Sequence, residues 1–289
     1  MSEKIVGHTG LAISFALASA VVLATMDAFA KLLLQDYPLL MVAWARFGIM
    51  AILYGAISWR SFGWRMFRPH RMRVQCLRAA VVVFATLAFY QGLIVLPLAE
   101  CVAIVFVAPI LTALISSRFL GERASRVTWI SLAGSFLGVL LIVRPGGELF
   151  SWASLFPLAS AVGLALYQVT TRAVSQVDDP RVTMFFTSIV VCAAFSLALP
   201  FGFAAPRSGS DLGLMVLVGV LGATGQLILT FAFRYAQAAV VASVGYSALI
   251  WSVAIGWIMF GHVPDVWSLL GMVVIAVSGI VLVKNGGRT

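Results

Sequence analysis

Two charged side chains lie deep within long apolar segments of this 289-residue chain. Asp27 falls about eight residues before a short polar turn at 35–38, and Arg46 falls about eight residues after that turn. At about 1.5 Å of rise per helical residue, the two would lie at similar depth in a pair of helices. Placing such a charge in lipid costs roughly 2.5–3.5 kcal/mol, so it needs a partner or a cavity. The spacing predicts an Asp27–Arg46 ion pair, or a role for both in binding a solute or a proton, with Lys31 as a second candidate partner of Asp27.

Neutral polar and amphipathic side chains occupy the middle of other apolar segments. Tyr and Trp combine an apolar ring with a polar tip, which suits a solute that has an apolar body and polar groups. Packing explains each of these side chains when it is taken alone, whereas the cluster as a whole favours a site. The candidate site residues are Asp27, Trp44, Arg46, Tyr90, Gln91, Tyr167, Gln168, Gln226, Tyr246, Ser247 and Trp251.

Motifs of catalysis and of metal or cofactor binding are missing from the sequence. The chain contains no HExxH, no GxSxG and no P-loop pattern. The three cysteines, at 76, 101 and 192, are isolated and odd in number, which favours small buried side chains over disulfides or metal ligands. We therefore predict no enzyme activity, no catalytic residue, no metal and no cofactor.

The composition predicts a membrane protein built only of helices. Hydrophobic residues make up 62% of the chain and charged residues 10%, against roughly 45–50% and about 25% in soluble domains. A helix of roughly 20 apolar residues crosses a bilayer, and it satisfies its backbone hydrogen bonds internally. We predict ten transmembrane helices, at 10–34, 39–59, 74–96, 98–118, 126–144, 149–175, 181–201, 211–233, 239–260 and 264–284.

The net charge of +9 is distributed by side of the membrane rather than in a patch that would bind nucleic acid. If the N-terminus is cytoplasmic, only Lys31, Arg144 and Arg207 fall on the outer side, and Arg46 lies within a helix. The cytoplasmic segments then carry Lys4, Arg60, Arg65, Arg68, Arg71, Arg73, Arg78, Arg118, Arg123, Arg126, Arg172, Arg181, Arg234, Lys284 and Arg288. This positive-inside bias predicts that both termini are cytoplasmic and that the basic residues face anionic lipid headgroups.

A repeated helix divides the chain into two halves. LASAVVLATMDAFAK from Leu17 matches LASAVGLALYQVTTR from Leu158, with Asp27 replaced by Gln168 and Lys31 by Arg172. LLIVRPGG and IVLVKNGG close the two halves. We predict two domains, residues 10–147 and 149–287, each of five helices.

Five is an odd number, so the second domain would cross the membrane upside down relative to the first. Inverted repeats of this kind are typical of transporters, which alternate between two states around a site near the membrane midplane. A duplication kept for packing alone is the other explanation. Gly134 and Gly138 form a GxxxG pattern that suits either a dimer face or close packing within one chain.

The chain resembles the EamA-type domains of the drug/metabolite transporter superfamily. The similarity rests on LASAV in both halves, on APILTALISSRFLGERAS from Ala108 and on LLIVRPGG. It implies ten helices, cytoplasmic termini, a central cavity lined by helices 1–4 and 6–9, and helices 5 and 10 at the periphery. The similarity is strongest to bacterial exporters of amino acids, aromatic ones included. The second half departs from the pattern, because Leu249 stands where the first half has Pro109, and GHVPD stands where it has GERAS.

The expected function is export of a small organic solute, amino acids above all, through the inner membrane of a bacterium. Protons are a candidate co-substrate, and the expected oligomeric state is a monomer or a weak homodimer. A sensor or scaffold that moves no solute is the alternative, and a channel is a weaker one because no ring of charges is visible. ALASA at 16–20 resembles a signal-peptide cleavage site, but cleavage there would destroy one copy of the repeat.

Overall fold

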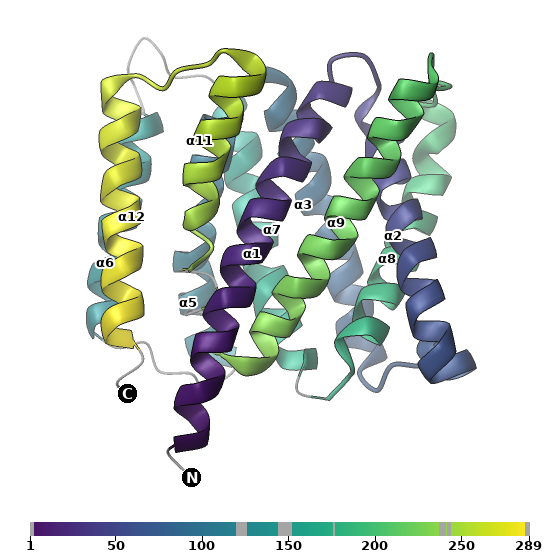
Figure 1. Cartoon of the computed structure of the whole chain (residues 1–289), viewed down its shortest axis with the longest axis horizontal. Coiled ribbons are helices and arrows are strands. Elements are labelled where there is room, and N and C mark those ends of the chain that lie inside the picture. Colours follow the sequence, from purple (N-terminus) through teal and green to yellow (C-terminus); the bar gives the residue numbers. More distant parts are fainter. Residues whose placement is uncertain are drawn as a thin grey trace.

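A computed structural model describes residues 3–119, 126–143, 152–175, 177–236, 241 and 244–286 of the chain. Within these ranges the regular secondary structure consists of helices joined by turns, and the helices run side by side in one bundle (Figure 1). The first half contains α1 (Glu3–Leu33), α2 (Leu39–Phe62), η1 (Gly63–Phe67), α3 (Met72–Val95), α4 (Leu98–Val105), α5 (Ala108–Phe119) and α6 (Arg126–Val143). The second half contains η2 (Trp152–Ser154), α7 (Leu155–Ser175), α8 (Pro180–Ala198), η3 (Leu199–Phe201), α9 (Gly209–Tyr235), α11 (Ser247–Phe260) and α12 (Val266–Gly286).

Six helical segments in the described ranges are long and apolar enough to cross a membrane. They are 10–33, 39–67, 72–95, 152–174, 180–201 and 209–235, and three shorter apolar helical segments, at 129–141, 247–260 and 266–278, accompany them. The chain is therefore an all-helical, multi-pass membrane protein.

The predicted helix 98–118 is wrong as a single element, because it is broken into α4 and α5. Pro109 has no N–H to donate to the Val105 carbonyl, so a regular helix cannot continue through this point. Phe106 and Val107 instead donate to carbonyls three residues back, at 3.1 and 3.2 Å. A break occurs at the matching place in the second half, before α11, although no proline stands there: the Ala248 N–H donates to the Gly245 carbonyl at 2.9 Å.

The two halves exchange equivalent contacts. Helix α1 packs along α9 of the other half, and α7 packs along α3. Ser19 and Ser160, the same position of the repeated LASAV, each donate a hydrogen bond across these contacts, to the Gly225 carbonyl at 2.9 Å and the Ala85 carbonyl at 3.0 Å. The repeated motif therefore joins the first helix of each half to the third helix of the other.

The basic residue that ends each repeated helix caps a neighbour. Lys31 Nζ donates to the carbonyls of Leu93 and Leu96, at 2.6 and 2.8 Å, where α3 ends. Arg172 Nη1 donates to the Phe233 carbonyl at 2.9 Å, near the end of α9. A cation at a helix C-terminus satisfies free carbonyls and complements the helix dipole. Lys31 is thus a cap, and no ion pair with Asp27 is found within the described part of the chain.

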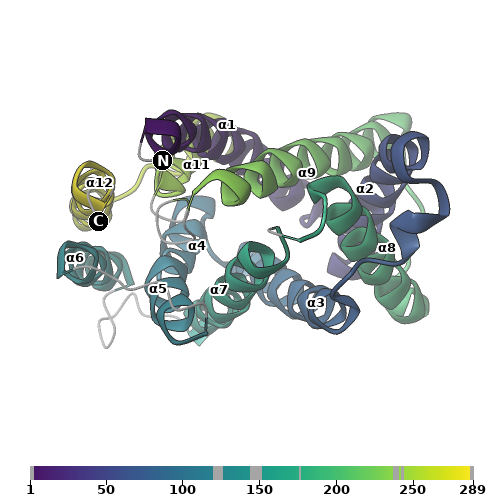
Figure 2. The ribbon, with the colours of Figure 1, turned by 90° about the horizontal axis from the view of Figure 1, so that it is seen from below.

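Helices α6 and α12 pack against each other at one edge of the bundle, away from the centre (Figure 2). A Cβ atom at Gly138 would lie 2.6 Å from the Gly271 carbonyl oxygen and 2.7 Å from Ile275. The GxxxG glycine therefore permits close packing within one chain.

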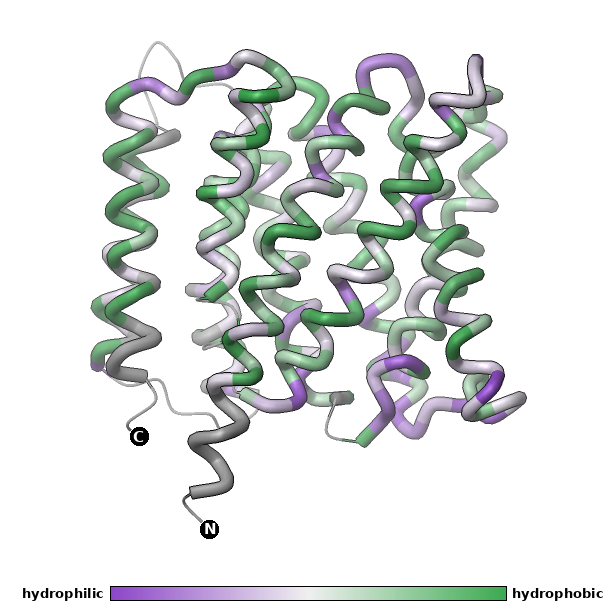
Figure 3. The backbone as a smooth tube through the Cα atoms, in the orientation of Figure 1, coloured by the Kyte–Doolittle hydropathy of each residue, from purple (hydrophilic) through white to green (hydrophobic). Residues whose placement is uncertain are grey.

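The two ends of the bundle differ in polarity. Helix α1 begins, and α12 ends, on the same side as η1 and the polar segment that follows it (Figures 1 and 3). We call this side, which carries Arg60, Arg65, Arg68 and Arg71, the basic face. The segment 202–208 lies on the opposite face.

Candidate functional site

A cavity of about 190 Å³, the central cavity, lies where the two halves meet. Its walls come from α1, α2, α3 and α4 of the first half and from α7, α8 and α9 of the second. An adjoining cavity of about 160 Å³ shares Asp27 and Gln226 with it and extends toward α5 and α11. Helices of both halves therefore surround one region in the middle of the bundle, as the similarity to EamA-type domains implied.

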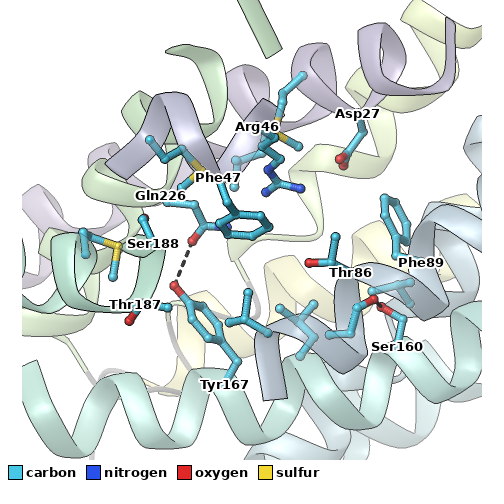
Figure 4. Close-up of a pocket in the computed structure, with 18 residues that line it drawn as sticks. Asp27, Arg46, Phe47, Thr86, Phe89, Ser160, Tyr167, Thr187, Ser188 and Gln226 are labelled. Atoms are coloured by element: carbon cyan, nitrogen blue, oxygen red, sulfur yellow. Dashed lines mark hydrogen bonds between the residues drawn. The ribbon is translucent and has the colours of Figure 1, made fainter. Parts of the chain in front are cut away.

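Asp27 and Arg46 both face the central cavity (Figure 4). The predicted ion pair is wrong for this conformation, because no contact within 4.0 Å joins the two side chains in the described part of the molecule. Arg46 Nη1 instead donates to the Tyr90 hydroxyl at 3.3 Å, and the guanidinium lies 5.1 Å from the centre of the Phe47 ring. A carboxylate and a guanidinium thus line one cavity without neutralising each other directly.

Three more of the predicted residues line these cavities. Tyr167 donates its hydroxyl hydrogen to Gln226 Oε1 at 3.0 Å, across the second half (Figure 4). Gln168, the counterpart of Asp27 in the repeat, lines the adjoining cavity and accepts a hydrogen bond from Thr112 at 3.0 Å. Two repeat-related positions, 27 and 168, therefore face the same region with different chemistry.

The other predicted residues lie around the cavities rather than in them. Tyr90 is fully buried and holds Arg46, and Tyr246 packs on Phe106, with ring centres 5.0 Å apart. Gln91 and Ser247 belong to neither cavity lining.

The two predicted tryptophans lie outside the linings of the central and adjoining cavities. Trp44 lies in a separate apolar hollow between α2, α8 and α9, where it donates to Ser196 at 2.9 Å. Trp251 is exposed on the outer side of α11. The sequence predicts how deep each tryptophan lies in the membrane, but the direction in which it faces depends on how its helix packs against the neighbouring helices.

Sequence reasoning missed small hydroxyl residues in the central cavity. Thr86, Ser160, Thr187 and Ser188 all line it. Ser and Thr are frequent where transmembrane helices pack closely, so their type alone does not distinguish a packing residue from a lining residue. Thr86 and Gln226 occupy matching positions of the repeat, 140 residues apart, and this symmetry is the one feature that points to Thr86.

Arg78, which the charge distribution counts among the cytoplasmic residues, is fully buried within the bundle. Its Nε donates to Thr171 at 2.8 Å, and Nη2 donates to the Tyr167 hydroxyl at 2.9 Å. Nη1 donates to Thr187 at 2.7 Å and to the Thr183 carbonyl at 3.3 Å. Tyr167 and Thr187 also line the central cavity, so Arg78 holds two of the lining side chains in place.

A chain of hydrogen bonds continues from Arg78 to the surface. Gln75 accepts from Arg78 at 3.4 Å and donates to Asp178 at 3.2 Å. Asp178 in turn accepts from the backbone N–H of His70 at 3.0 Å and lies 2.8 Å from its ring Nδ1. We call the set that joins α3 to α7 and α8 in this way the basic-face bridge: His70, Gln75, Arg78, Thr171, Asp178, Thr183 and Thr187.

Comparison with known proteins agrees with this architecture. The model of the EamA-like transporter family matches residues 10–144 and again residues 151–284. A riboflavin transporter of Rhizobium johnstonii is 28% identical over 253 residues, which are 87% of this chain and 83% of the relative.

Two further relatives carry other names. A pseudopaline exporter of Pseudomonas aeruginosa is 28% identical over 72% of this chain and 74% of its own length. An S-adenosylmethionine uptake transporter of Rickettsia conorii is 26% identical over 74% of this chain and 72% of its own length. A solved crystal structure has the same fold, with a TM-score of 0.75, 19% identity and coverage of 96% of this chain and 98% of that one.

Proposed function

The chain belongs to the EamA-like transporter family. We propose that it is a secondary carrier or facilitator that exports small organic metabolites, above all amino acids, aromatic ones included. The observation that carries this proposal is the central cavity, which is lined by helices from both halves. Rocking of one half against the other would expose such a cavity to each side in turn.

The chemistry of the central cavity supports an amino acid as the solute. Asp27 suits an ammonium group or a proton, and Arg46 suits a carboxylate. Phe47, Phe89 and Tyr167 offer aromatic surface to the apolar part of a solute. In this conformation the cavity lies below the roughly 300 Å³ at which ligand pockets usually begin, which favours a small metabolite.

The charge distribution supports one orientation of the chain in the membrane. We place the basic face and both termini in the cytoplasm of a bacterium, with the chain in the inner membrane. Single cysteines in a cysteine-free background test this, since Ser61 and Ser208 are both exposed. An impermeant thiol reagent applied to intact cells should label Ser208→Cys and miss Ser61→Cys. The reverse pattern would overturn the orientation.

Efflux from liposomes tests the function. Purified protein is reconstituted, loaded with a mixture of amino acids, riboflavin and S-adenosylmethionine, and assayed with and without a pH gradient. We expect efflux of aromatic amino acids, and faster efflux under a pH gradient if Asp27 carries a proton. Riboflavin and S-adenosylmethionine are included because two relatives are named as transporters of these compounds. Efflux of those two alone would leave a carrier with a different substrate.

Two neighbouring positions on α7 separate a blocked cavity from a damaged protein. Gln168→Trp places a bulky ring in the adjoining cavity, whereas Leu166→Trp adds the same ring on the exposed side of the same helix. We expect Gln168→Trp to abolish efflux with an unchanged amount of folded protein, and Leu166→Trp to behave like wild type. Equal efflux in the two variants would argue against a solute path through this region.

A sensor or scaffold is the competing function. Such a protein would bind a metabolite in the same cavity but move none of it, so binding without efflux under any gradient would favour it.

A further inference from the structure

We infer that Arg46 forms a subsite for the carboxylate of a small zwitterionic solute. The inference rests on the proposed function, because it assigns one group of the transported solute to one wall of the central cavity.

The Arg46 guanidinium has unused hydrogen-bonding capacity. Its side chain is 92% buried, since its exposed fraction is 8%. Arginine has five N–H donors, yet a single hydrogen bond, to the Tyr90 hydroxyl at 3.3 Å, is described for this one. The buried Nε has no partner in the structure. An ionised donor left unpaired in a buried position is costly, so its retention indicates a ligand.

Surrounding residues hold the guanidinium in place against the cavity. Tyr90, which accepts its hydrogen bond, is itself fully buried. On the other side lies Gly222 of α9, where a Cβ atom would sit only 3.2 Å from Arg46 Nε. Phe47 lies beneath the charge at 5.1 Å. The side chain is therefore positioned by α2, α3 and α9, and Figure 4 shows its nitrogens directed toward the cavity.

The geometry favours a carboxylate over other anions. The guanidinium is planar and matches the two oxygens of a carboxylate with two parallel donors. Asp27 faces the same cavity, so a solute with further negative charge would be repelled. An amino group on the same solute would instead be attracted to Asp27. The preferred ligand class is therefore a small amino acid with its carboxylate at Arg46 and its ammonium group at Asp27.

Matched pairs of ligands isolate the carboxylate. L-phenylalanine is compared with L-phenylalaninamide, and L-leucine with L-leucinamide, by competition against radiolabelled L-phenylalanine and by thermal stabilisation of the purified protein. Both members of each pair keep the side chain, and at about pH 6 both also carry the ammonium group, so they differ only in the carboxylate. We expect wild-type protein to prefer the carboxylate member about ten- to a hundredfold, as for a charge-assisted hydrogen bond.

Variants at position 46 assign the preference to one side chain. Arg46→Gln should bind both members of a pair about equally, and Arg65→Gln, on the exposed basic face, should keep the wild-type preference. If Arg46→Gln does not fold, Arg46→Lys provides the test. It retains the charge but not the planar donor pair, so its preference should fall between those of the other two proteins.

The outcomes separate the subsite from the proposed function. A wild-type protein without preference for any carboxylate member, or an Arg46→Gln protein with an undiminished preference, overturns the subsite. A retained preference without efflux in liposomes would leave the subsite standing and refute the carrier function. Efflux only of solutes that lack a carboxylate would support the carrier function and refute the subsite.

Discussion

At the two ends of the bundle, equivalent turns contact the other half through side chains of different chemistry. On the basic face, the turn before α8 meets the start of α3 through buried Asp178, Gln75 and Arg78. On the opposite face, the matching turn before α2 meets the start of α9, where Tyr37 donates to Asp211 at 2.7 Å and Arg207 lies 3.2 Å from Asp36. We call Asp36, Tyr37, Arg207 and Asp211 the opposite-face bridge.

The bridges differ above all in exposure. The side chains of Arg207 and Asp36 are 69% and 62% exposed, whereas Asp178 is 2% exposed on the basic face. Exposed ion pairs contribute about 0–1 kcal/mol, but a buried network loses much more when one member is removed. Breaking the exposed ion pair of the opposite-face bridge should therefore cost little, and the basic-face bridge should contribute more to holding the two halves together.

Tyr37 adds a neutral link to the weaker bridge. Burial, followed by its hydrogen bond to Asp211, raises the pKa of the Tyr37 hydroxyl above its ordinary value. The group thus stays protonated through the physiological range and continues to donate. The opposite-face bridge should not open through ionisation of Tyr37 near neutral pH.

Arg78→Ala should have the largest effect. It removes five hydrogen bonds to oxygen acceptors and a sixth to the Met184 sulfur, and it leaves Thr171, Thr187 and Tyr167 without their buried donor. We expect a loss on the order of 3–5 kcal/mol, or a fall in Tm on the order of 10 °C, measured by thermal unfolding in detergent.

Arg65→Ala is the control, because it removes the same charge from an exposed site on the same face. A Tm for Arg78→Ala within about 2 °C of that control would show that the basic-face bridge contributes little. The contrast between the two ends of the bundle would then have no energetic basis.

Asp27 and Arg46 lie between the two bridges, and exchanging them tests whether they form an ion pair. The double variant, Asp27→Arg with Arg46→Asp, would restore the activity lost in the single variants if a direct ion pair were the main role of these two residues. Because the two side chains face the cavity without a contact within 4.0 Å, in the part of the chain that is described, we expect the swap to remain inactive in efflux. Recovery of more than about half of the wild-type rate would favour a pair that forms in another conformation.

Much of the fold follows from composition, because apolar segments of about 20 residues have few alternatives in lipid. The repeat of LASAV, with Ser19 and Ser160, indicated which helices correspond. The break between α4 and α5 was missed, although Pro109 is the local cause of it. The break before α11 has no proline, so the matching position in the repeat was its one sequence feature.

The site was harder to predict than the fold. Asp27 and Arg46 stand out because a charge in lipid is costly, and both face the central cavity. The burial of Arg78 was not predicted, because this residue closes a run of arginines in the sequence and its partners on α7 and α8 are distant in the chain. Trp44 and Trp251 were misplaced because depth in a membrane does not specify a side of the helix.

The two helix caps extend the comparison between the faces. Lys31→Met removes the donor to the end of α3 on the opposite face, and Arg172→Met removes the donor to the end of α9 on the basic face. Each loses charge-assisted bonds to carbonyls, for which we expect about 1–2 kcal/mol and a fall in Tm of a few degrees. A much larger fall for one of them, in the same unfolding assay, would show that the repeat-related caps are unequal.

The smallest effect should come from Arg207→Gln, which breaks the exposed ion pair of the opposite-face bridge. Solvent and salt already screen this pair, so we expect less than about 1 kcal/mol and a Tm within about 3 °C of wild type. Arg207 also holds Tyr37 through its backbone N–H, at 2.8 Å, and the substitution leaves that bond in place. Asp36→Asn is the matched variant. The stability losses of the two single variants should not add in the double variant, because both substitutions remove the same interaction. A loss as large as that of Arg78→Ala would mean that the contacts at both ends of the bundle contribute equally to stability, and the asymmetry argued from exposure would be wrong.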